Sequence, residues 1–546
     1  MTTANADTLP PPAPALTRSM REIMALRDEY QERLRQHPFY EWIRDPAVDL
    51  ADKLMFMPAM TLFVMNFRDM NLWVIRFEED DGDVLKQIIN GSTTEDETHS
   101  RLFLEDWRKL HFDDHLGWRP SDVLWWLFLS EEMEDFRRMG VEFMRLSADD
   151  ADDPLVRFAH SEAGEACGHV FFEHISPLAQ KLGDERGLDY RYFGMFHLEL
   201  ETGHVLESED VFQDQPLSED QYERGVTLAK RMFGIFDVIH DAFYQYVERY
   251  VRTGTTPKRG ATVRYVDESN DSRSPAAVPS SGHTEVHESQ RALQEHLETR
   301  ASRAADHGFY RWLRSSKLPP VERIQRFLPL WAFDMLGYRD LNKYVFKFTP
   351  PRNELERSVN VIASDLESHS QLFLQDWSAL GLDEMLRWPA SDTLDFLFLD
   401  YFMDRHRKNL ITFGMLGLRH RTALERLWLM EALEKSGHAF FENTRVIALE
   451  AEKQSGIRLD YLADRHATVH ESERGEVENF KMVRMPRGME QHAHGFIDTV
   501  FDALERNLAM SLDAVRENKL AVRPSHLRLK ATADPASAVA AKEEAS

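Results

Sequence analysis

Two short stretches of the chain place carboxylates and a histidine at helical spacing. The first is residues 161–173, SEAGEACGHVFFE, and the second is residues 430–442, MEALEKSGHAFFE. Both keep Glu, Glu, His and Glu at steps of three, four and four, which puts the side chains on one helix face. The members are Glu162, Glu165, His169 and Glu173 in the first stretch, and Glu431, Glu434, His438 and Glu442 in the second. A Glu and a His four residues apart can reach one metal ion. The alternative is the wet face of an amphipathic helix, and the repeat within one chain argues against it.

A third stretch carries three further donors on one helix face. His197, Glu201 and His204 are spaced by four and three residues, and His466, His470 and Glu473 repeat the steps with the last two types exchanged. Two imidazoles and one carboxylate suit iron or manganese and leave positions open for oxygen. A surface helix with salt bridges is the alternative interpretation.

A fourth group lies just before a conserved-looking internal motif. Glu95 and His99 are four residues apart, and Asp365 and His369 repeat the arrangement in the second half. At that spacing the two donors of each pair share one helix face, and we expect His99 and His369 to occupy equivalent places in the two halves.

Other polar residues in apolar surroundings are better explained by structure. Asp69 and Asp340 recur in an Arg-Asp-x-Asn pattern, which indicates a buried polar network or a metal ligand, and we favour the structural role. His37 and His307 stand beside aromatic residues, where packing or helix capping is expected. Cys167, the one cysteine, is predicted to be a small core residue.

The elements that hold these residues form a tandem repeat with an offset near 270 residues. Residues 99–107, HSRLFLEDW, and 369–377, HSQLFLQDW, match at seven of nine positions. Helices are predicted to open at 120–122 and 390–392, where the Ser or the Asp of each start is typical of N-cap chemistry. Alternating strand patterns are rare, and 263–266 is the one short candidate, so the fold class is all-α. The predicted organisation is a disordered leader (1–19), a first helical domain (20–252), a linker rich in Gly, Pro and Ser (253–287), a second helical domain (288–515) and a tail (516–546).

Composition narrows the class of function. The chain has 546 residues and a net charge of −27, which argues against a general binder of nucleic acid or anionic membranes. A single cysteine excludes a disulfide framework and any multi-cysteine metal site. There is no signal-peptide pattern at the start and no apolar run near twenty residues, so a cytoplasmic protein is expected.

The order of these donors resembles the haem-oxygenase-like dimetal oxidases. The motif His197-x-x-x-Glu201-x-x-His204 is similar to the third core helix of that family. The resemblance implies the seven-helix fold of haem oxygenase, thiaminase II and the PQQ-synthesis oxidase, repeated in tandem. It also implies that His99 comes from the first core helix and Glu165 or Glu162 from the second. The family's first-helix Glu falls at Ser92 here and at Ile362 in the repeat, with Glu95 and Asp365 as the nearest substitutes.

The resemblance implies a non-haem iron enzyme that uses O2 to oxidise a small organic substrate, with one or two iron ions per active domain and manganese as the other suitable metal. The alternatives are a non-catalytic helical protein that binds a ligand or partner, and a haem-binding or haem-degrading enzyme. We expect donor atoms of the first half to converge on an ion at about 2.0–2.3 Å. The expected metal ligands are Glu95, His99, Glu162, Glu165, His169, His197, Glu201 and His204 in the first half, and His369, Glu434, His438, His466, His470 and Glu473 in the second.

Overall fold

The computed structural model describes residues 18–95, 98–199, 211–260, 286–365, 369–463, 478–522 and 524, with all their side chains except those of residues 95, 365 and 478. These residues are predominantly helical, which confirms the all-α class. The strands among them are two-residue segments, β1 (Arg18–Ser19) and β2 (Pro216–Leu217), which pair antiparallel. The strand candidate at 263–266 lies outside the described residues.

The helices of the first half begin beside the described start of the chain and end before residue 252. They are α1 (Met20–Leu34), α2 (Pro38–Arg44), η1 (Asp52–Leu54), α3 (Met57–Met70), the π-helix η2 (Asn71–Ile75), α4 (Val84–Glu95), α5 (His99–Lys109), α6 (Phe112–Leu116), α7 (Pro120–Phe128), α8 (Glu134–Asp149), α9 (Pro154–Arg186), α11 (Glu219–Tyr246) and the π-helix η4 (Val247–Val251).

The helices of the second half follow nearly the same order. They are η5 (Glu288–Gln290), α12 (Arg291–Ala305), α13 (Gly308–Ser315), α14 (Pro320–Phe327), η6 (Leu328–Trp331), α15 (Ala332–Asp340), the π-helix η7 (Leu341–Phe346), α16 (Glu354–Asp365), α17 (His369–Ala379), α18 (Leu382–Leu386), α19 (Ala390–Leu399), α20 (Tyr401–Arg419), α21 (Ala423–Ser455), η10 (Glu478–Met482), α23 (Met489–Glu517) and η11 (Lys519–Ala521). His99 and His369 each open the corresponding helix, α5 and α17.

The longest helices of the two halves, α9 and α21, have well-defined ends. Asp153 caps α9 by accepting from the backbone N–H groups of residues 155 and 156, and Thr422 caps α21 in a reciprocal pair with Glu425. Each helix stops at a glycine in the left-handed region, Gly187 (φ 66°) and Gly456 (φ 74°). Apolar residues lie on several sides of both helices, as expected of helices that pack against others all round.

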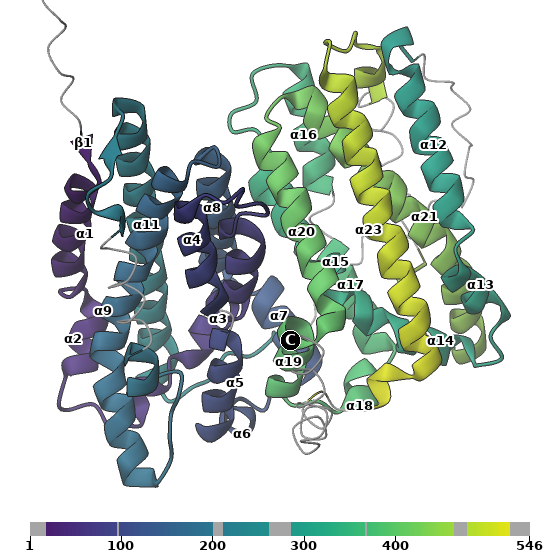
Figure 1. The fold of residues 1–546 in the computed structure, drawn as a ribbon. Helices are drawn as coiled ribbons and strands as arrows, with labels where there is room; N and C mark the ends of the chain where they lie inside the picture. The colour runs from purple at the N-terminus through teal and green to yellow at the C-terminus, as the bar shows by residue number, and fades with distance from the viewer. Residues whose placement is uncertain are drawn as a thin grey trace, which may run out of the picture.

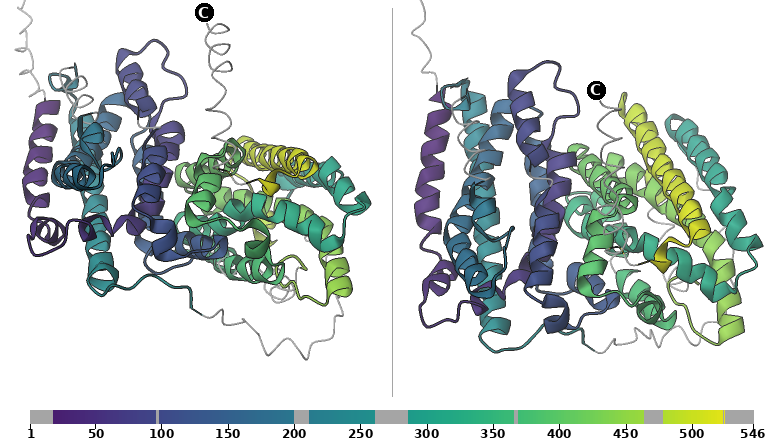
Figure 2. Two further views of the ribbon diagram at one scale, coloured as in Figure 1. Left: turned by 90° about the horizontal axis from the view of Figure 1, so that it is seen from below. Right: turned by 60° about the horizontal axis from the view of Figure 1, so that its bottom comes forward.

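In each half the long helices pack side by side around a shared apolar core. Helix α9 packs along α11 and α1, and α21 packs in the same way along α23 and α12. The purple-to-blue helices of the first half lie beside the green-to-yellow helices of the second in every view (Figures 1 and 2). None of the helices in the described ranges is both long and apolar enough to cross a membrane.

The contact between the halves is reciprocal. Ser121 donates from its backbone N and its Oγ to the carboxylate of Asp383, at 2.9 and 2.6 Å. Ser391 makes the same two bonds to Asp113, at 2.8 and 2.6 Å. Of the residues expected to cap these helices, Asp122 does so, since its Oδ2 accepts from the backbone N of Arg119 at 3.0 Å, whereas the two serines do not. The helices do open where expected, but Ser121 and Ser391 stand within the first turn and bond across to the other half.

Buried ion pairs repeat the exchange between the halves. Arg407 donates to Asp69 at 2.5 Å, and Arg137 lies 3.4 Å from Asp340. Both arginines also donate to a main-chain carbonyl of their own half. Asp69 and Asp340 thus belong to a structural polar network, as their sequence pattern indicates. A contact in which each half gives and receives the same bonds has the form of an interface between two-fold related subunits.

Candidate metal centre

Two of the predicted ligands of the first half lie side by side in its core. The rings of His99 and His197 are 4.3 Å apart between centroids, and both side chains are buried. His99 stacks on Phe67, while Phe172 of α9 lies 3.9 Å from the His197 ring. Aromatic rings thus enclose the histidine pair and separate it from solvent.

Helix α5 supplies both His99 and the residue that fixes the backbone before His197. Asp106 lies two turns after His99, and its carboxylate accepts the backbone N–H groups of residues 191, 192 and 193 at 2.9–3.0 Å. Burial raises the pKa of Asp106 to about 6, although these bonds act in the opposite direction. The turn that leads into His197 is therefore tied to the helix that carries His99.

The tautomer of His197 follows from its hydrogen bond. Nδ1 of His197 lies 2.8 Å from the carbonyl oxygen of Tyr192, which can only accept, so Nδ1 carries the proton. The lone pair is left on Nε2, the atom that a metal would use. Burial lowers the pKa of His197 to about 4, so the ring is neutral at neutral pH, as ligation requires.

Helix α9 turns two more predicted donors toward the same region. Phe172 touches His197, and Glu165 and His169 lie two turns and one turn earlier on that face of the helix. Nδ1 of His169 is buried with no hydrogen-bond partner in the part of the chain that the structure describes. Such a buried nitrogen could bind a ligand or a metal ion.

Glu162 is engaged elsewhere. Its carboxylate accepts from Arg27 of α1 at 2.6 Å and is buried. The structure thus places Glu162 in a contact that ties α9 to α1. Glu201 and His204, and the side chain of Glu95, lie outside what the structure describes.

The second half contains an aspartate that holds the backbone in the same way as Asp106, and we call the two residues aspartate anchors. Asp376 of α17 accepts the backbone N–H groups of Tyr461 and Leu462 at 3.2 and 2.8 Å, and burial raises its pKa to about 7. His369 meets the ring of Tyr461 edge-on at 6.3 Å, as His99 meets Tyr192 at 6.4 Å.

The other predicted ligands of the second half are not seen to gather around His369 in the part of the chain that the structure describes. His438 is half exposed and pairs with Glu442 one turn later, at 3.0 Å. Glu434 lies on α21 at the position that corresponds to Glu165. His466, His470 and Glu473 lie outside the described residues.

Asp106 and Asp376 are the positioning residues that sequence reasoning did not single out. Both stand in the motif shared by 99–107 and 369–377, so the repeat itself contained the signal. A scan against known protein families gives no match, and a comparison with curated proteins gives none either. The assignment of this site therefore depends on its own geometry.

Proposed function

We propose that the first half of the chain is a non-haem iron oxidase that uses O2 to oxidise a small organic substrate. The observation that carries the proposal is the buried pair of His99 and His197, in which the proton of His197 is fixed on Nδ1 by Tyr192. Such a pair, with Glu165 and His169 on the neighbouring helix face, fits the imidazole and carboxylate ligands of one or two iron ions. Manganese is the second metal that this donor set suits.

The protein's own residues have three roles in this proposal. His99 and His197 would hold the metal, and Asp106 positions His197 through the backbone of residues 191–193. Phe67, Phe172 and Tyr192 exclude water from the histidine pair. Bound iron would supply oxygen activation, with O2 as the oxidant.

We also propose that each half is a haem-oxygenase-like domain and that the chain is a tandem duplication. The shared order of helices, the two aspartate anchors and the reciprocal contacts between Ser121, Asp383, Ser391 and Asp113 support this proposal. The second half would either hold a metal of its own or hold none. The residues of its own site would be His369, Glu434, His466, His470 and Glu473.

The test is metal analysis of the full-length protein produced in iron-rich medium. We expect at least one iron per chain and a higher unfolding temperature for the iron-loaded protein than for chelator-treated protein. His197→Gln should lose that iron and any O2 consumption, because the amide lacks the imidazole lone pair while it keeps a polar side chain of similar size.

Two control variants sharpen the result. His115→Ala removes an exposed histidine of the same half and should leave the iron content unchanged. His369→Ala reports the share of iron held by the second half. If His197→Gln and His99→Gln both keep full iron content, the oxidase proposal fails, and a non-catalytic binding protein becomes the better account. A haem spectrum on titration with haem would instead favour the haem-binding alternative.

A further inference from the structure

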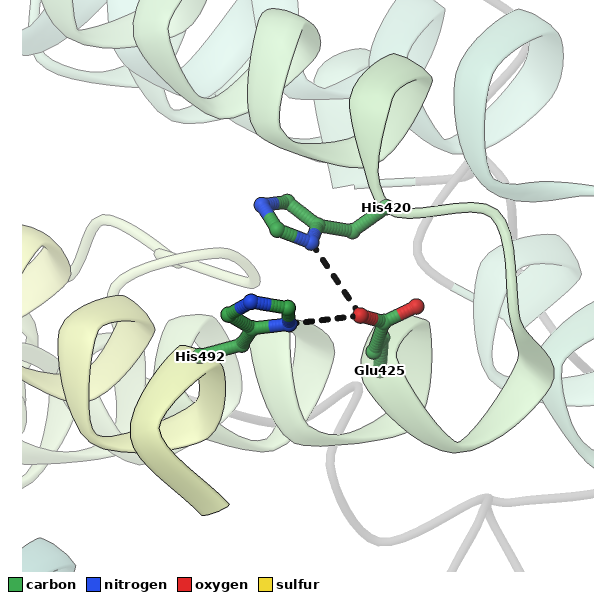
Figure 3. Close-up of side chains that lie close together, drawn as sticks. All are labelled: His420, Glu425 and His492. Atoms are coloured by element: carbon green, nitrogen blue, oxygen red, sulfur yellow. Dashed lines mark hydrogen bonds and ion pairs between the residues drawn. The ribbon is translucent and has the colours of Figure 1, made fainter. Parts of the chain in front are cut away.

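A second cluster of metal-ligand side chains lies in the other half, away from the histidine pair. His420 follows the last residue of α20, Glu425 lies in the first turn of α21, and His492 lies in the first turn of α23. The three side chains point toward one another, although they come from three different elements (Figure 3). The Nδ1 atoms of His420 and His492 lie 3.1 and 2.9 Å from the same oxygen, Oε1 of Glu425.

The carboxylate at the centre is held in place by its own helix cap. Oε2 of Glu425 accepts from Oγ1 of Thr422 at 2.7 Å, which leaves Oε1 directed at the two histidines. Burial acts to raise the pKa of Glu425, but the bonds from Thr422, His492 and His420 together lower it. The carboxylate is therefore ionised and oriented, as a metal ligand must be.

The surroundings of the two imidazoles differ in a way that suits an open metal site. His420 is three-quarters buried and meets the edge of Phe496 at 4.9 Å, whereas half of the His492 side chain is exposed. One of the two imidazoles is thus packed against an aromatic ring, and the other is accessible to water. Two His and one Glu with one open position are the ligand set of many zinc sites.

The spacing of the donor atoms agrees with one ion among them. All three ligand atoms lie within 4.8 Å of one another. Ligands at about 2.0–2.1 Å from a tetrahedral zinc stand roughly 3.3 Å apart, so the two N–O distances of 3.1 and 2.9 Å would widen by only a few tenths of an ångström when zinc binds. We propose that His420, Glu425 and His492 form a zinc site that joins the first turn of α23 to the corner between α20 and α21.

The first half provides an internal reference for this site. At the repeat offset set by Arg157 and Arg426, Ala151 and Val156 stand in place of His420 and Glu425. The first half therefore lacks two of the three ligands. The site binds one zinc per chain, and none of its ligands belongs to the proposed iron centre.

The experiment is a titration of chelator-treated, full-length protein with Zn²⁺ by calorimetry, repeated with Co²⁺ to read tetrahedral geometry from its visible absorption. We expect the wild type to bind one more high-affinity equivalent than His492→Ala, or to bind that equivalent more than about 100-fold more tightly. Zinc that enters the emptied iron site is counted equally in both proteins, because that site is the same in each. His492 is half exposed, so its removal leaves the core intact. Glu425→Gln tests the carboxylate separately, because glutamine retains the reciprocal helix cap with Thr422.

His494→Ala is the matched control, since His494 lies two residues further along α23, on another face, beside His296. It should bind zinc as the wild type does. Equal stoichiometry and affinity in the wild type and His492→Ala would overturn the proposal, and the two histidines would then serve only as hydrogen-bond donors to Glu425. Loss of iron in His197→Gln is read in a separate experiment, so failure of either proposal does not affect the other.

Discussion

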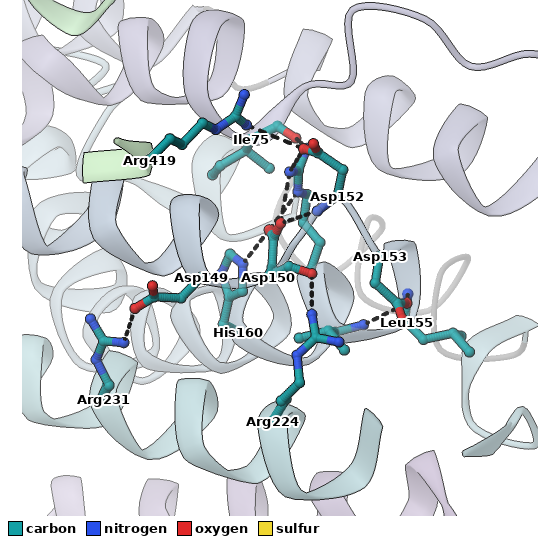
Figure 4. A network of polar contacts seen from close by, with 12 residues as sticks. Ile75, Asp149, Asp150, Asp152, Asp153, Leu155, His160, Arg224, Arg231 and Arg419 are labelled. Atoms are coloured by element: carbon teal, nitrogen blue, oxygen red, sulfur yellow. Dashed lines mark hydrogen bonds and ion pairs between the residues drawn. The ribbon is translucent and has the colours of Figure 1, made fainter. Parts of the chain in front are cut away.

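The corner between α8 and α9 and the corner between α20 and α21 each lead into the longest helix of their half, yet they carry different chemistry. In the first corner, Arg157 makes two bonds to Asp150 at 2.7 and 2.9 Å, and His160 lies 3.2 Å from the same carboxylate (Figure 4). All three side chains are buried. The first corner is thus a closed ion-pair network.

The second corner keeps the arginine but not its acid. Arg426 donates to the carbonyl of Phe346 at 2.8 Å, as Arg157 donates to that of Ile75 at 3.0 Å. Arg419 stands at the repeat position of Asp150, so Arg426 has no equivalent carboxylate partner. The acidic residue of the second corner is Glu425, which faces His420 and His492.

The comparison of the two corners shows which of their contacts is common to both halves and which is not. The bond from arginine to the end of the π-helix is present in both halves, because a buried carbonyl there needs a donor. The acidic residue differs between the two corners in its position and in its partners. One half uses it to neutralise a buried arginine, and the other presents it with two imidazoles at a partly open site.

The largest expected effect is the loss of stability when the arginine of each corner is replaced. Arg157→Met leaves Asp150 buried without its cation, which should cost about 3–5 kcal/mol of unfolding free energy. Arg426→Met removes only a bond to a carbonyl and the contact with Phe348, and should cost about 1–3 kcal/mol. Denaturant unfolding at pH 7 gives both values. Equal losses would mean that Asp150 contributes nothing specific to the first corner.

The two aspartate anchors sharpen the comparison where the halves agree. Burial raises the pKa of Asp106 to about 6 and that of Asp376 to about 7, above the unfolded value near 3.8. The stability that each contributes is therefore full below about pH 4 and falls as the pH rises through 6 or 7. We expect a decline on the order of 2 kcal/mol per site, which Asp106→Asn and Asp376→Asn should each remove. Unfolding free energies across pH 4–8 check this, and a flat profile in the wild type would contradict it.

The interface between the halves offers a third comparison. Asp69 pairs with Arg407 at 2.5 Å, whereas Asp340 lies 3.4 Å from Arg137. Asp69→Asn should destabilise by about 1–3 kcal/mol and Asp340→Asn by about 1 kcal/mol, since the closer pair loses more. Thermal unfolding of the two variants measures the difference. The reverse order would show that the shorter distance does not mark the stronger of the two ion pairs.

Sequence periodicity predicted the helices well because their signals are local. The starts of α7 and α19, the core position of Cys167 and the structural role of Asp69 all follow from neighbouring residues. The proximity of His99 and His197 was expected from the resemblance, while convergence of the whole donor set on a metal stays a prediction.

The features that sequence reasoning missed depend on contacts between distant segments. Ser121 has the local pattern of a cap, and only the other half of the chain reveals Asp383 as its partner. The cluster of His420, Glu425 and His492 spans three elements, one of them 67 residues beyond Glu425, and has no counterpart in the first half. Neither helical spacing nor the internal repeat could indicate it.

The smallest expected effect concerns the histidine caps, where the halves are nearly identical. Nδ1 of His37 accepts from the backbone N of Phe39, and Nδ1 of His307 accepts from that of Phe309, both at 3.2 Å, as the sequence analysis predicted. Replacing either by Ala should cost about 0.5–1 kcal/mol, and replacing it by Asn should restore most of that. Nε2 of His37 also lies 3.3 Å from Oδ1 of Asp241.

Burial lowers the pKa of His307, although the charge of Glu505 acts in the opposite direction. Protonation of Nδ1 removes the acceptor, so this cap is present above about pH 6.5 and is lost as the pH falls below the folded pKa. We therefore expect the cost of His307→Ala to shrink between pH 7.5 and 4.5. Unfolding curves of the wild type and the variant at the two pH values measure the change, and a cost that stays the same would mean that protonation of His307 does not break its cap.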